Sequence, residues 1–559
     1  LLTLSCFAQF SFAQNKVVKG SVLDTSGYPI IGATIKIVGS NQATVTDMDG
    51  NFTIQDVNPK ATINVSYIGM QPQTLKVTDN LKVVLNDDFQ NLNDVVVIGY
   101  GSAKAKDLTS PITVIKADDI KSTPSSSPMS ALQGKVAGVN VVNSGTPGAG
   151  PTVRVRGVGS FGNSSPLYVV DGMFYDDINF INNDDIQDMT ILKDASAAAI
   201  YGVRAANGVV LITTKKGVKN QSAKITYDGY VGIQKATNVL KMANSSQYDT
   251  MLMEANFDAY SPMIKNSIDR FGGSYADSDF HKWTYGANTD WYDELLRTAV
   301  MTNHSIGISG GSDKSTYSLG MSYLAQDGIM DVKNNYKRLN FRAAIDYDAT
   351  KWLKVGFNGV FSQSSQILPN NTAWQQAFNT PGLIPVYDNN NENAKPEKYA
   401  SPKSIGLSDN FKNPVATANY YDSKNDLRQY MTNFYAQLNI VPEKLTFKTS
   451  INYNYQNIDG RTFVPTYYVE SNQQSNATSL TKTNTQYNNY IWDNTLTYKD
   501  SFGKHNFGAM LGTSMRQETY KNLWGSAPNV PEGNDSYLYL GQGSTTGITL
   551  GDAGTKFRG

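Results

Sequence analysis

The sequence contains very little of what metal centres and disulfides are built from. Its 559 residues include one cysteine, Cys6, and three histidines, His281, His304 and His505. A single cysteine excludes a disulfide scaffold and a thiolate metal site, and the histidines lack the spacing of a metal-binding pair. We therefore expect no metal and no cofactor, and we interpret the three histidines as exposed loop residues.

The sequence also has no excess of positive or negative charge and, after its first residues, no long apolar run. The 48 basic residues balance the 48 acidic residues, so the composition indicates no nucleic-acid surface and no polybasic membrane anchor. After Asn15, no apolar run reaches the ~18–20 residues that a membrane helix needs. If the chain crosses a membrane, we expect it to do so as a β-barrel.

The first residues are similar to the end of a secretory signal. The apolar run closes on Phe12-Ala13-Gln14 before the polar Asn15, and it has neither an initiator methionine nor a basic start. We expect residues 1–14 to be a signal-peptide remnant that is clipped at its N-terminus. A lipoprotein signal at Cys6 is the alternative, although Thr3 stands where such a signal usually has leucine.

Tyrosine, glycine and short alternating runs are abundant, as in an all-β protein with many turns. Residues 16–86 contain five alternating runs separated by turn signals, which predicts a small β-sandwich. Residues 87–106 are expected to be a linker. Residues 107–217 predict an α/β unit with six strand-like runs and two short helical stretches, at 128–135 and 195–200.

Residues 218–559 have longer strands in which apolar and polar residues alternate strictly, as where Phe341 and Ile345 alternate with Asn340 and Arg342. Runs of about ten residues or more exceed the usual strand of a soluble sheet. Short turns alternate with long links, and aromatic residues lie near strand ends, where an interfacial girdle is expected: Tyr347, Trp352, Tyr455, Trp492 and Tyr498. The pattern predicts an antiparallel transmembrane β-barrel with long extracellular loops.

We count about nine to ten of the ~22 strands that a barrel wide enough for a separate inner domain has. We therefore expect this barrel to be incomplete at its C-terminal side, and the sequence as given not to fold or insert alone. Within the linker, residues 94–101 form a strongly β-prone strip with no hairpin partner beside it. The strip is either a strand of a neighbouring domain or a free strand offered to a partner sheet.

Five segments in order carry a family resemblance: VVKGSVLDTSGYPIIGATIKIVGSNQATVTDMDGNFTI, DVVVIGYG, ALQGKVAGVNVV with VRVRGVGSFGNSSPLYVVDG, ILKDASAAAIYGVRAANGVVLITTKKG, and NTDWYDELLRTAVMTNHSIGISGGSDKSTYSLGMSYLAQDGI. Together they resemble the SusC/RagA family of TonB-linked outer-membrane proteins of Bacteroidetes. The resemblance implies a mainly β chain, with a carboxypeptidase-regulatory-like β-sandwich, an α/β plug domain and an incomplete antiparallel transmembrane β-barrel.

The resemblance also implies a function. The family imports large nutrients, glycans or peptides, across the outer membrane of Gram-negative bacteria, with a SusD-like surface lipoprotein as a lid. TonB in the periplasm, where the N-terminal domain would lie, pulls the plug open with energy from the proton gradient. The strip would contact TonB through Asp94, Val95, Val96, Val97, Ile98, Gly99 and Tyr100.

Within the plug signatures, Arg154 and Arg156 are expected on one face of a strand, where they pair with lumenal carboxylates or are ordinary surface charges. Several glycines, Gly159 among them, are expected to permit tight turns. The residues assigned to plug gating and structure are Arg154, Arg156, Gly157, Asp171, Gly172, Tyr201, Gly202, Asn207 and Gly208.

Other classes fit less well. A glycosidase needs two carboxyls ~5–9.5 Å apart in an open cleft, whereas Asp171, Asp184 and Asp185 would be sheltered by a barrel, so we expect no enzyme. A passive porin or a surface adhesin explains neither the plug nor the strip. The substrate is not encoded legibly, because the loop aromatics either stack on sugars or, as we favour, pack the loops together: Tyr260, Trp283, Tyr285, Trp374, Tyr387, Tyr420 and Tyr421.

Overall fold

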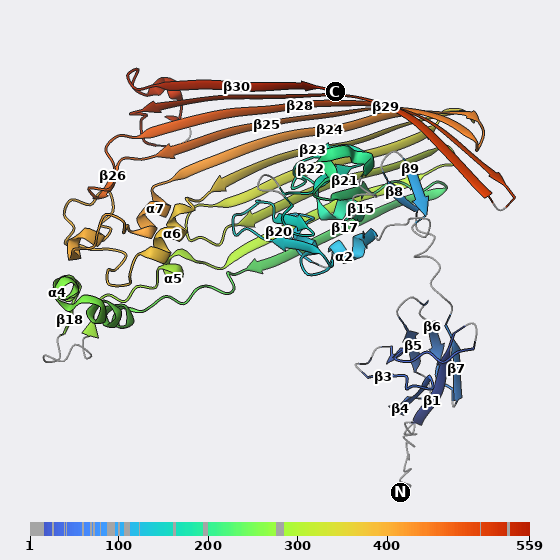
Figure 1. Ribbon diagram of the computed structural model, residues 1–559, viewed down its shortest axis with the longest axis horizontal. Helices are drawn as coiled ribbons and strands as arrows, with labels where there is room; N and C mark the ends of the chain where they lie inside the picture. The colour runs from blue at the N-terminus through green and yellow to red at the C-terminus, as the bar shows by residue number, and fades with distance from the viewer. Residues whose placement is uncertain are drawn as a thin grey trace, which may run out of the picture. The chain divides into compact units, whose positions relative to one another are not determined.

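The computed structural model (Figure 1) comprises two compact units, residues 1–110 and 111–559. The structure describes residues 16–24, 27–38, 40, 42–58, 61–67, 70, 73–78, 80–85, 95–98, 101–104, 112–121, 123–159, 164–193, 199–274, 284–503, 505–533 and 537–559.

The N-terminal unit holds a β-sandwich made of two sheets. One sheet has the order β4 (Asn51–Val57), β1 (Lys16–Leu23), β7 (Asn80–Val84), and the other has the order β3 (Ala43–Val45), β2 (Thr34–Ile37), β5 (Thr62–Ser66), β6 (Gln73–Lys76). Alternate residues of both sheets, such as Val22 and Ile35, are fully buried in one apolar core. The predicted sandwich is confirmed, with β3 and β6 as additional strands that are too short, at three and four residues, for an alternating pattern to reveal them.

The β-prone strip has a partner strand. β8 (Val95–Ile98) pairs antiparallel with β9 (Gly101–Lys104), so that a two-stranded sheet forms. The prediction that no hairpin partner lies beside the strip is therefore wrong. The sequence Gly-Ser-Ala-Lys of β9 has no β-branched or aromatic residue and hence little β-propensity. Asp94, Gly99 and Tyr100 lie outside the described residues.

The second unit begins with the α/β unit. Its main sheet has the order β10 (Ile112–Lys116), β15 (Ile186–Leu192), β16 (Val209–Thr214), β13 (Leu167–Val170), β14 (Met173–Tyr175), and β11 (Val139–Val142) pairs with β12 (Thr152–Val155). All six predicted runs thus contain strands. The helices are α2 (Ala117–Lys121), η2 (Ser130–Leu132), η3 (Asn183–Asp185) and η4 (Ala199–Ala205).

The first predicted helical stretch is shorter than expected, and most of the second lies outside the described residues. Only a 3-10 turn, η2, occurs within 128–135, and the described end of the second stretch belongs to the 3-10 helix η4. Ala131 and Leu132 of η2 are fully buried, so tertiary packing and not helical propensity holds this segment.

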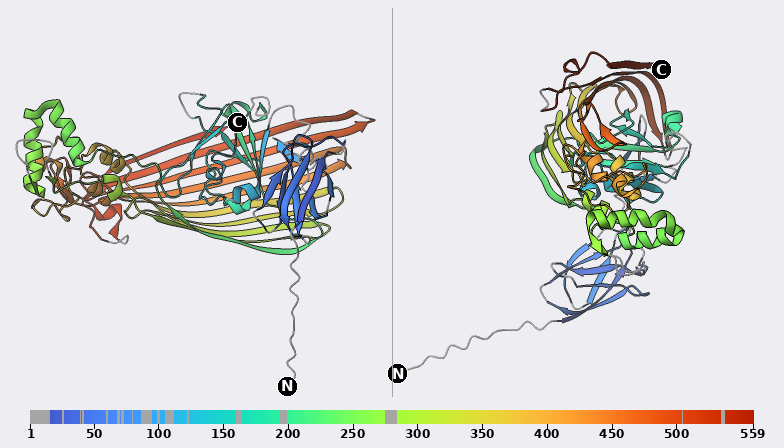
Figure 2. Two further views of the ribbon diagram at one scale, coloured as in Figure 1. Left: turned by 90° about the horizontal axis from the view of Figure 1, so that it is seen from below. Right: turned by 90° about the vertical axis from the view of Figure 1, so that its left-hand side faces the viewer.

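A ten-stranded antiparallel sheet follows, with each strand paired to its neighbour along the sheet: β17 (Gln221–Gln234), β20 (Ala299–Gly311), β21 (Ser315–Asp327), β22 (Asn335–Asp348), β23 (Leu353–Leu368), β24 (Asp422–Val441), β25 (Leu445–Val464), β28 (Ser479–Phe502), β29 (His505–Pro528) and β30 (Thr549–Arg558). Figure 2 shows the sheet curving round the α/β unit. Its ten strands agree with the predicted number.

The two faces of this sheet reverse the pattern of a soluble protein. On β22, the apolar Phe341 and Ile345 are 50% and 44% exposed, whereas the intervening Asn340 and Arg342 are 1% and 3% exposed. The polar face is buried because it packs on the α/β unit, and the apolar face points outward. The predicted alternation is confirmed, and an outward apolar face on strands this long suits a lipid environment.

The long links between the strands are structured. The link after β17 contains α4 (Ser245–Phe271), which starts with a capping box between Asn244 and Gln247. The other elements in these links are β18 (Gly273–Ser274), β19 (Thr284–Tyr285), α5 (Trp291–Leu295), α6 (Thr372–Asn379), η5 (Pro402–Ile405), α7 (Pro414–Asn419), β26 (Tyr467–Glu470), β27 (Gln473–Ser475) and η7 (Leu540–Gln542). Within the described residues, no helix is both long and apolar enough to span a bilayer.

Aromatic side chains pack these links together, as the sequence interpretation favoured. Trp374 stacks on Tyr292 with ring centroids 6.3 Å apart. Tyr420 is 8% exposed and stacks on Tyr467 at 4.4 Å. Of the same group, Tyr387 is 54% exposed, and Trp283 lies outside the described residues.

Candidate functional site

The inward face of β22 holds the α/β unit through a row of polar side chains. Arg338 and Asn340 point the same way because every second residue of a strand shares a face. The Arg338 Nη1 donates hydrogen bonds to the carbonyl oxygens of Ser126, at 3.3 Å, and Asn179. The Asn340 Nδ2 donates to the carbonyl oxygen of Phe180 at 2.8 Å. These bonds satisfy loop carbonyls of the α/β unit that this sheet removes from water.

The third member of this row, Arg342, forms a buried ion pair with Asp185 of η3. The Arg342 Nε lies 2.9 Å from the Asp185 Oδ1, and the two side chains are only 3% and 9% exposed. The guanidinium also donates to the Lys215 carbonyl oxygen at 2.6 Å and to the Ser318 Oγ at 2.9 Å. A buried charge requires both a counter-charge and hydrogen bonds. We call this contact the Arg342–Asp185 latch.

A second charged cluster lies next to the latch and joins α2 to β17 and β20. The Lys121 Nζ lies 2.8 Å from the Asp228 Oδ2 and 3.9 Å from the Asp184 Oδ1. The Asp184 Oδ2 accepts a hydrogen bond from the Asn303 Nδ2 at 3.0 Å. Burial raises the pKa of Asp184, and it lowers the pKa of the nearby Lys215. Both groups therefore resist ionisation where they are packed.

Asp171 ties the α/β unit to β23. It lies in the turn between β13 and β14 with a positive φ of 48°. Its carboxylate accepts from the backbone N and the Oγ1 of Thr214, at 3.1 and 2.7 Å, and also from the Nδ2 of Asn358. A carboxylate committed to three donors in this way has a structural role, which agrees with the expectation that Asp171 is not catalytic.

A fourth contact reaches β29 through Arg204. Its guanidinium pairs with Asp176 at 3.2 Å and with Glu518 of β29 at 3.5 Å. The Phe174 ring lies 5.8 Å from the Arg204 guanidinium and 5.4 Å from that of Arg516, and its edge meets Tyr201. Tyr201, which the plug signature singled out, thus packs beside this contact.

Arg154 and Arg156 do not lie on one strand face, contrary to the prediction from the sequence pattern. β12 ends at Val155, so Arg156, with a φ of 57°, lies beyond the strand and does not alternate with Arg154 on one strand face. Arg154 has an exposed side chain. Their pairing with lumenal carboxylates stays a prediction. The latch has the opposite polarity, with its arginine on the sheet and its carboxylate on the α/β unit.

Four residues of this interface were not predicted from the sequence: Arg338, Arg342, Asp184 and Asp185. A signal was available, because two arginines four residues apart on the polar face of a long alternating strand need counter-charges or hydrogen-bond partners wherever that face is buried. What the sequence alone lacks is the partner, since Asp185 lies more than 150 residues away, at 157 positions from Arg342.

Four of the signature glycines adopt positive φ angles: Gly157, Gly172, Gly202 and Gly208. Gly208 follows Asn207 and has a φ of 88°, and a Cβ built there would lie 3.1 Å from the Val155 side chain and 3.2 Å from the Leu192 carbonyl oxygen. Both its backbone angle and its surroundings therefore require glycine.

A cavity of about 470 Å³ on the outer face of the sheet and another of about 340 Å³ at the tip of the α/β unit are also present. The tip cavity lies between Ser144, Pro147, Ile329 and Trp374. The tip is held by Gln366, whose Nε2 donates to the Pro147 carbonyl oxygen at 2.7 Å. Across the described part of the chain, no group of three metal-ligating side chains comes together.

Known proteins similar to this chain share both its units. Residues 104–209 match the TonB-dependent Receptor Plug Domain, and residues 18–97 match the CarboxypepD_reg-like domain. The TonB-dependent receptor SusC of Bacteroides thetaiotaomicron is 36% identical over 68% of this chain and 37% of that protein. The TonB-dependent receptor P3 of Formosa agariphila is 31% identical over 96% of this chain and 51% of that protein.

A solved structure of the RagAB peptide importer in the 'open-open' state is 25% identical, covers 83% of this chain and 53% of its own, and superposes with a TM-score of 0.67. This chain belongs to the SusC/RagA family of TonB-dependent receptors. The family resemblance and the predicted fold class are confirmed. The α/β unit is the plug, and the ten-stranded sheet, called the wall below, resembles the barrel of such receptors.

The chain covers only part of the length of its SusC/RagA relatives. It spans about half the length of the curated relatives that it matches, from 37% of SusC to 51% of receptor P3. These relatives are receptors and not enzymes, which confirms the prediction of no enzymatic activity. TonB-dependent receptors are outer-membrane β-barrel proteins, and the outward apolar face of the wall is consistent with contact with lipid.

Proposed function

We propose that this chain takes part in TonB-dependent import of a large nutrient, a glycan or a peptide, across the outer membrane of a Gram-negative bacterium. The observation that carries the proposal is the seating of the plug on the polar face of the wall through buried, hydrogen-bonded charges, while the opposite face is apolar. A plug held by a few ionic contacts blocks passage at rest and is released when an external force breaks those contacts.

The β8–β9 sheet is the proposed point at which the force enters. A two-stranded sheet has main-chain donors and acceptors along both outer edges, so a strand of TonB can add to it. The residues proposed to contact TonB remain Asp94, Val95, Val96, Val97, Ile98, Gly99 and Tyr100. In this arrangement the N-terminal domain lies in the periplasm, and the tether from the strip reaches the plug at β10.

A SusD-like surface lipoprotein is the proposed lid, since RagAB neighbours are described as a peptide importer and SusC is a relative. The nutrient is proposed to meet the plug at its tip, where the cavity between Pro147 and Trp374 joins plug and loops. A passive porin and an adhesin are the alternative functions, and neither uses a plug that is tethered to an energised partner.

The test removes residues 94–100 from the full-length gene. We expect uptake of the nutrient to stop while surface expression stays intact. A matched variant that replaces the same residues with a Gly/Ser linker of equal length keeps the tether but removes the strand. Loss of uptake in both variants supports strand addition by TonB, whereas unchanged uptake in both would leave only the passive functions.

A sharper pair of point variants uses Val96, which pairs with Ala103 of β9. Val96→Pro removes a main-chain donor, and Val96→Thr keeps it together with the β-branched shape. Import by strand addition predicts lower uptake for Val96→Pro only, measured with equal amounts of receptor in the outer membrane.

A further inference from the structure

Three basic residues form one row across the outer face of the wall. Lys424 of β24 lies opposite Arg461 of β25, and Arg461 lies opposite Lys482 of β28. They share the strand face of Tyr430, which is 42% exposed, and not that of Gln429, which is 3% exposed and faces inward. The row therefore points away from the plug, outside the path that a nutrient would take.

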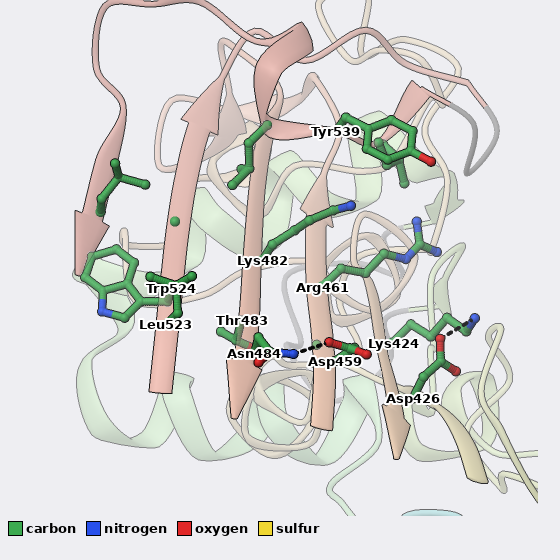
Figure 3. Close-up of a pocket in the computed structure, with 15 residues that line it drawn as sticks. Lys424, Asp426, Asp459, Arg461, Lys482, Thr483, Asn484, Leu523, Trp524 and Tyr539 are labelled. Atoms are coloured by element: carbon green, nitrogen blue, oxygen red, sulfur yellow. Dashed lines mark hydrogen bonds and ion pairs between the residues drawn. The ribbon is translucent and has the colours of Figure 1, made fainter. Parts of the chain in front are cut away.

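The row lines the cavity of about 470 Å³ on this face. Figure 3 shows Lys424, Arg461 and Lys482 on neighbouring strands, with Tyr539, from the link between β29 and β30, above Lys482. The Lys482 Nζ lies 4.6 Å from the centre of the Tyr539 ring. The other end of the cavity is apolar and is lined by Leu523, Leu538, Leu540 and Leu550. The cavity thus offers cations, an aromatic ring and an apolar wall to one ligand.

Two of the three cations already have carboxylate partners. Lys424 pairs with Asp426 at 2.9 Å, and Arg461 pairs with Asp422 at 3.1 Å. Lys482 pairs with no carboxylate among the described residues, and its contact is the Tyr539 ring. A lysine in a cavity with a neighbouring arginine and lysine attracts an anionic ligand, and it supplies a charge-assisted hydrogen bond to it.

The distance between this row and the aromatic belt restricts which anionic ligands can reach the row. An aromatic belt crosses the outer face where Phe361, Tyr430 and Tyr455 contact one another, with ring centroids 5.1 and 6.1 Å apart. Lys424 is six residues beyond Tyr430, which is roughly 20 Å along the strand and about 14 Å above the belt for a strand tilted by ~45°. Headgroups of phospholipids occupy only about 5–8 Å on each side of the hydrocarbon.

We propose that this cavity binds the anionic saccharide head of a glycolipid in the outer leaflet of the membrane. A sugar headgroup extends beyond the phospholipid layer and reaches the row. Its phosphate or carboxylate groups pair with Lys482, a sugar ring packs on Tyr539, and its acyl chains remain beside the apolar band below. The inference goes beyond nutrient import, and it needs only that the outer face of the wall meets the membrane.

The test measures the glycolipid retained by full-length receptor purified in detergent. Lys482→Glu reverses the charge without an ion pair to break, and we expect a loss of about tenfold or more in retained glycolipid, as for the loss of one charge-assisted contact. Lys337→Ala is the matched control. Lys337 is exposed on the same outer face and, through Ser365, at the level of Asp426. Lys337 does not itself line the cavity.

Stripped receptor is then titrated with the purified glycolipid, with its saccharide freed of acyl chains, and with phosphatidylglycerol. Binding of the glycolipid that Lys482→Glu weakens and Lys337→Ala preserves supports the proposal. Equal binding of the freed saccharide, or of phosphatidylglycerol, overturns it in favour of a soluble anion or of general anionic lipid. Insensitivity to Lys482→Glu overturns it as well. Removal of residues 94–100 should abolish uptake without changing retention, so failure of the import proposal is distinguishable.

Discussion

Asp185→Asn tests whether the Arg342–Asp185 latch seats the plug. The substitution preserves the shape of the side chain and removes its charge. The Arg342 guanidinium, 3% exposed, then keeps its bonds to Lys215 and Ser318 but has lost the carboxylate 2.9 Å away. Removing one partner of a buried pair costs about 3–5 kcal/mol. The population of unseated plug should therefore rise by about 10²-fold or more.

Hydrogen exchange in the full-length receptor measures this population. The informative peptide contains β15 (Ile186–Leu192), because η3 with Asp185 leads directly into it. The control is Asp348→Asn, which breaks the solvent-exposed ion pair between Lys219 and Asp348, where a change of at most about 1 kcal/mol is expected. Equal exchange of β15 in the two variants would refute the latch.

A double-mutant cycle separates the ion pair from a general loss of stability. Arg342→Met combined with Asp185→Asn removes both charges, so the double variant should be less destabilised than the two single variants summed. Additive effects would mean that the two residues act independently, and the latch as described would then be incorrect.

Three further predictions concern the plug. Gly208→Ala forces a φ of 88° on alanine and should destabilise the plug by about 1–3 kcal/mol, seen as faster exchange of β16. Burial raises the pKa of Asp184 above its ordinary value of 3.8, so the seated plug favours the protonated carboxyl. Its stability should fall as pH rises from 3.8 through the raised pKa, and urea midpoints should show a smaller fall in Asp184→Asn. A disulfide between Val114→Cys and Thr190→Cys, which are paired between β10 and β15, should block uptake until it is reduced.

The wall could be predicted in some detail because its physical signal is local. Strict alternation such as Leu339, Asn340, Phe341, Arg342 specifies both the strand and its two faces, and the structure has both as predicted. A period of two is read directly from neighbouring residues. The family segments added what alternation cannot supply, namely that the buried polar face surrounds a plug.

The structure of the links and the contacts of the plug could not be predicted in the same way. α4 was missed because its helical pattern is interrupted. Asn256 has non-helical backbone angles and Pro262 lies inside the helix, so the helical spacing of Ile264 and Ile268 continues over only part of its length. The latch was missed because a pair 157 residues apart has no local pattern. β9 was missed because pairing with β8, and not its own propensity, makes it a strand.

The order of strands in the plug sheet determines what a pull from the N-terminal side releases first. β10 is the first plug strand after the tether, and among the described strands it lies at the edge of the order β10-β15-β16-β13-β14, paired with β15. α2 follows it directly and carries Lys121, the cation of the cluster with Asp184 and Asp228. We therefore infer that force peels β10 and α2 away first, while the Arg342–Asp185 latch still holds the centre of the plug. Partial unfolding of the plug would then open a path along β17 and β20. The β10–β15 disulfide distinguishes this route from expulsion of the whole plug, because the disulfide blocks partial unfolding and permits expulsion.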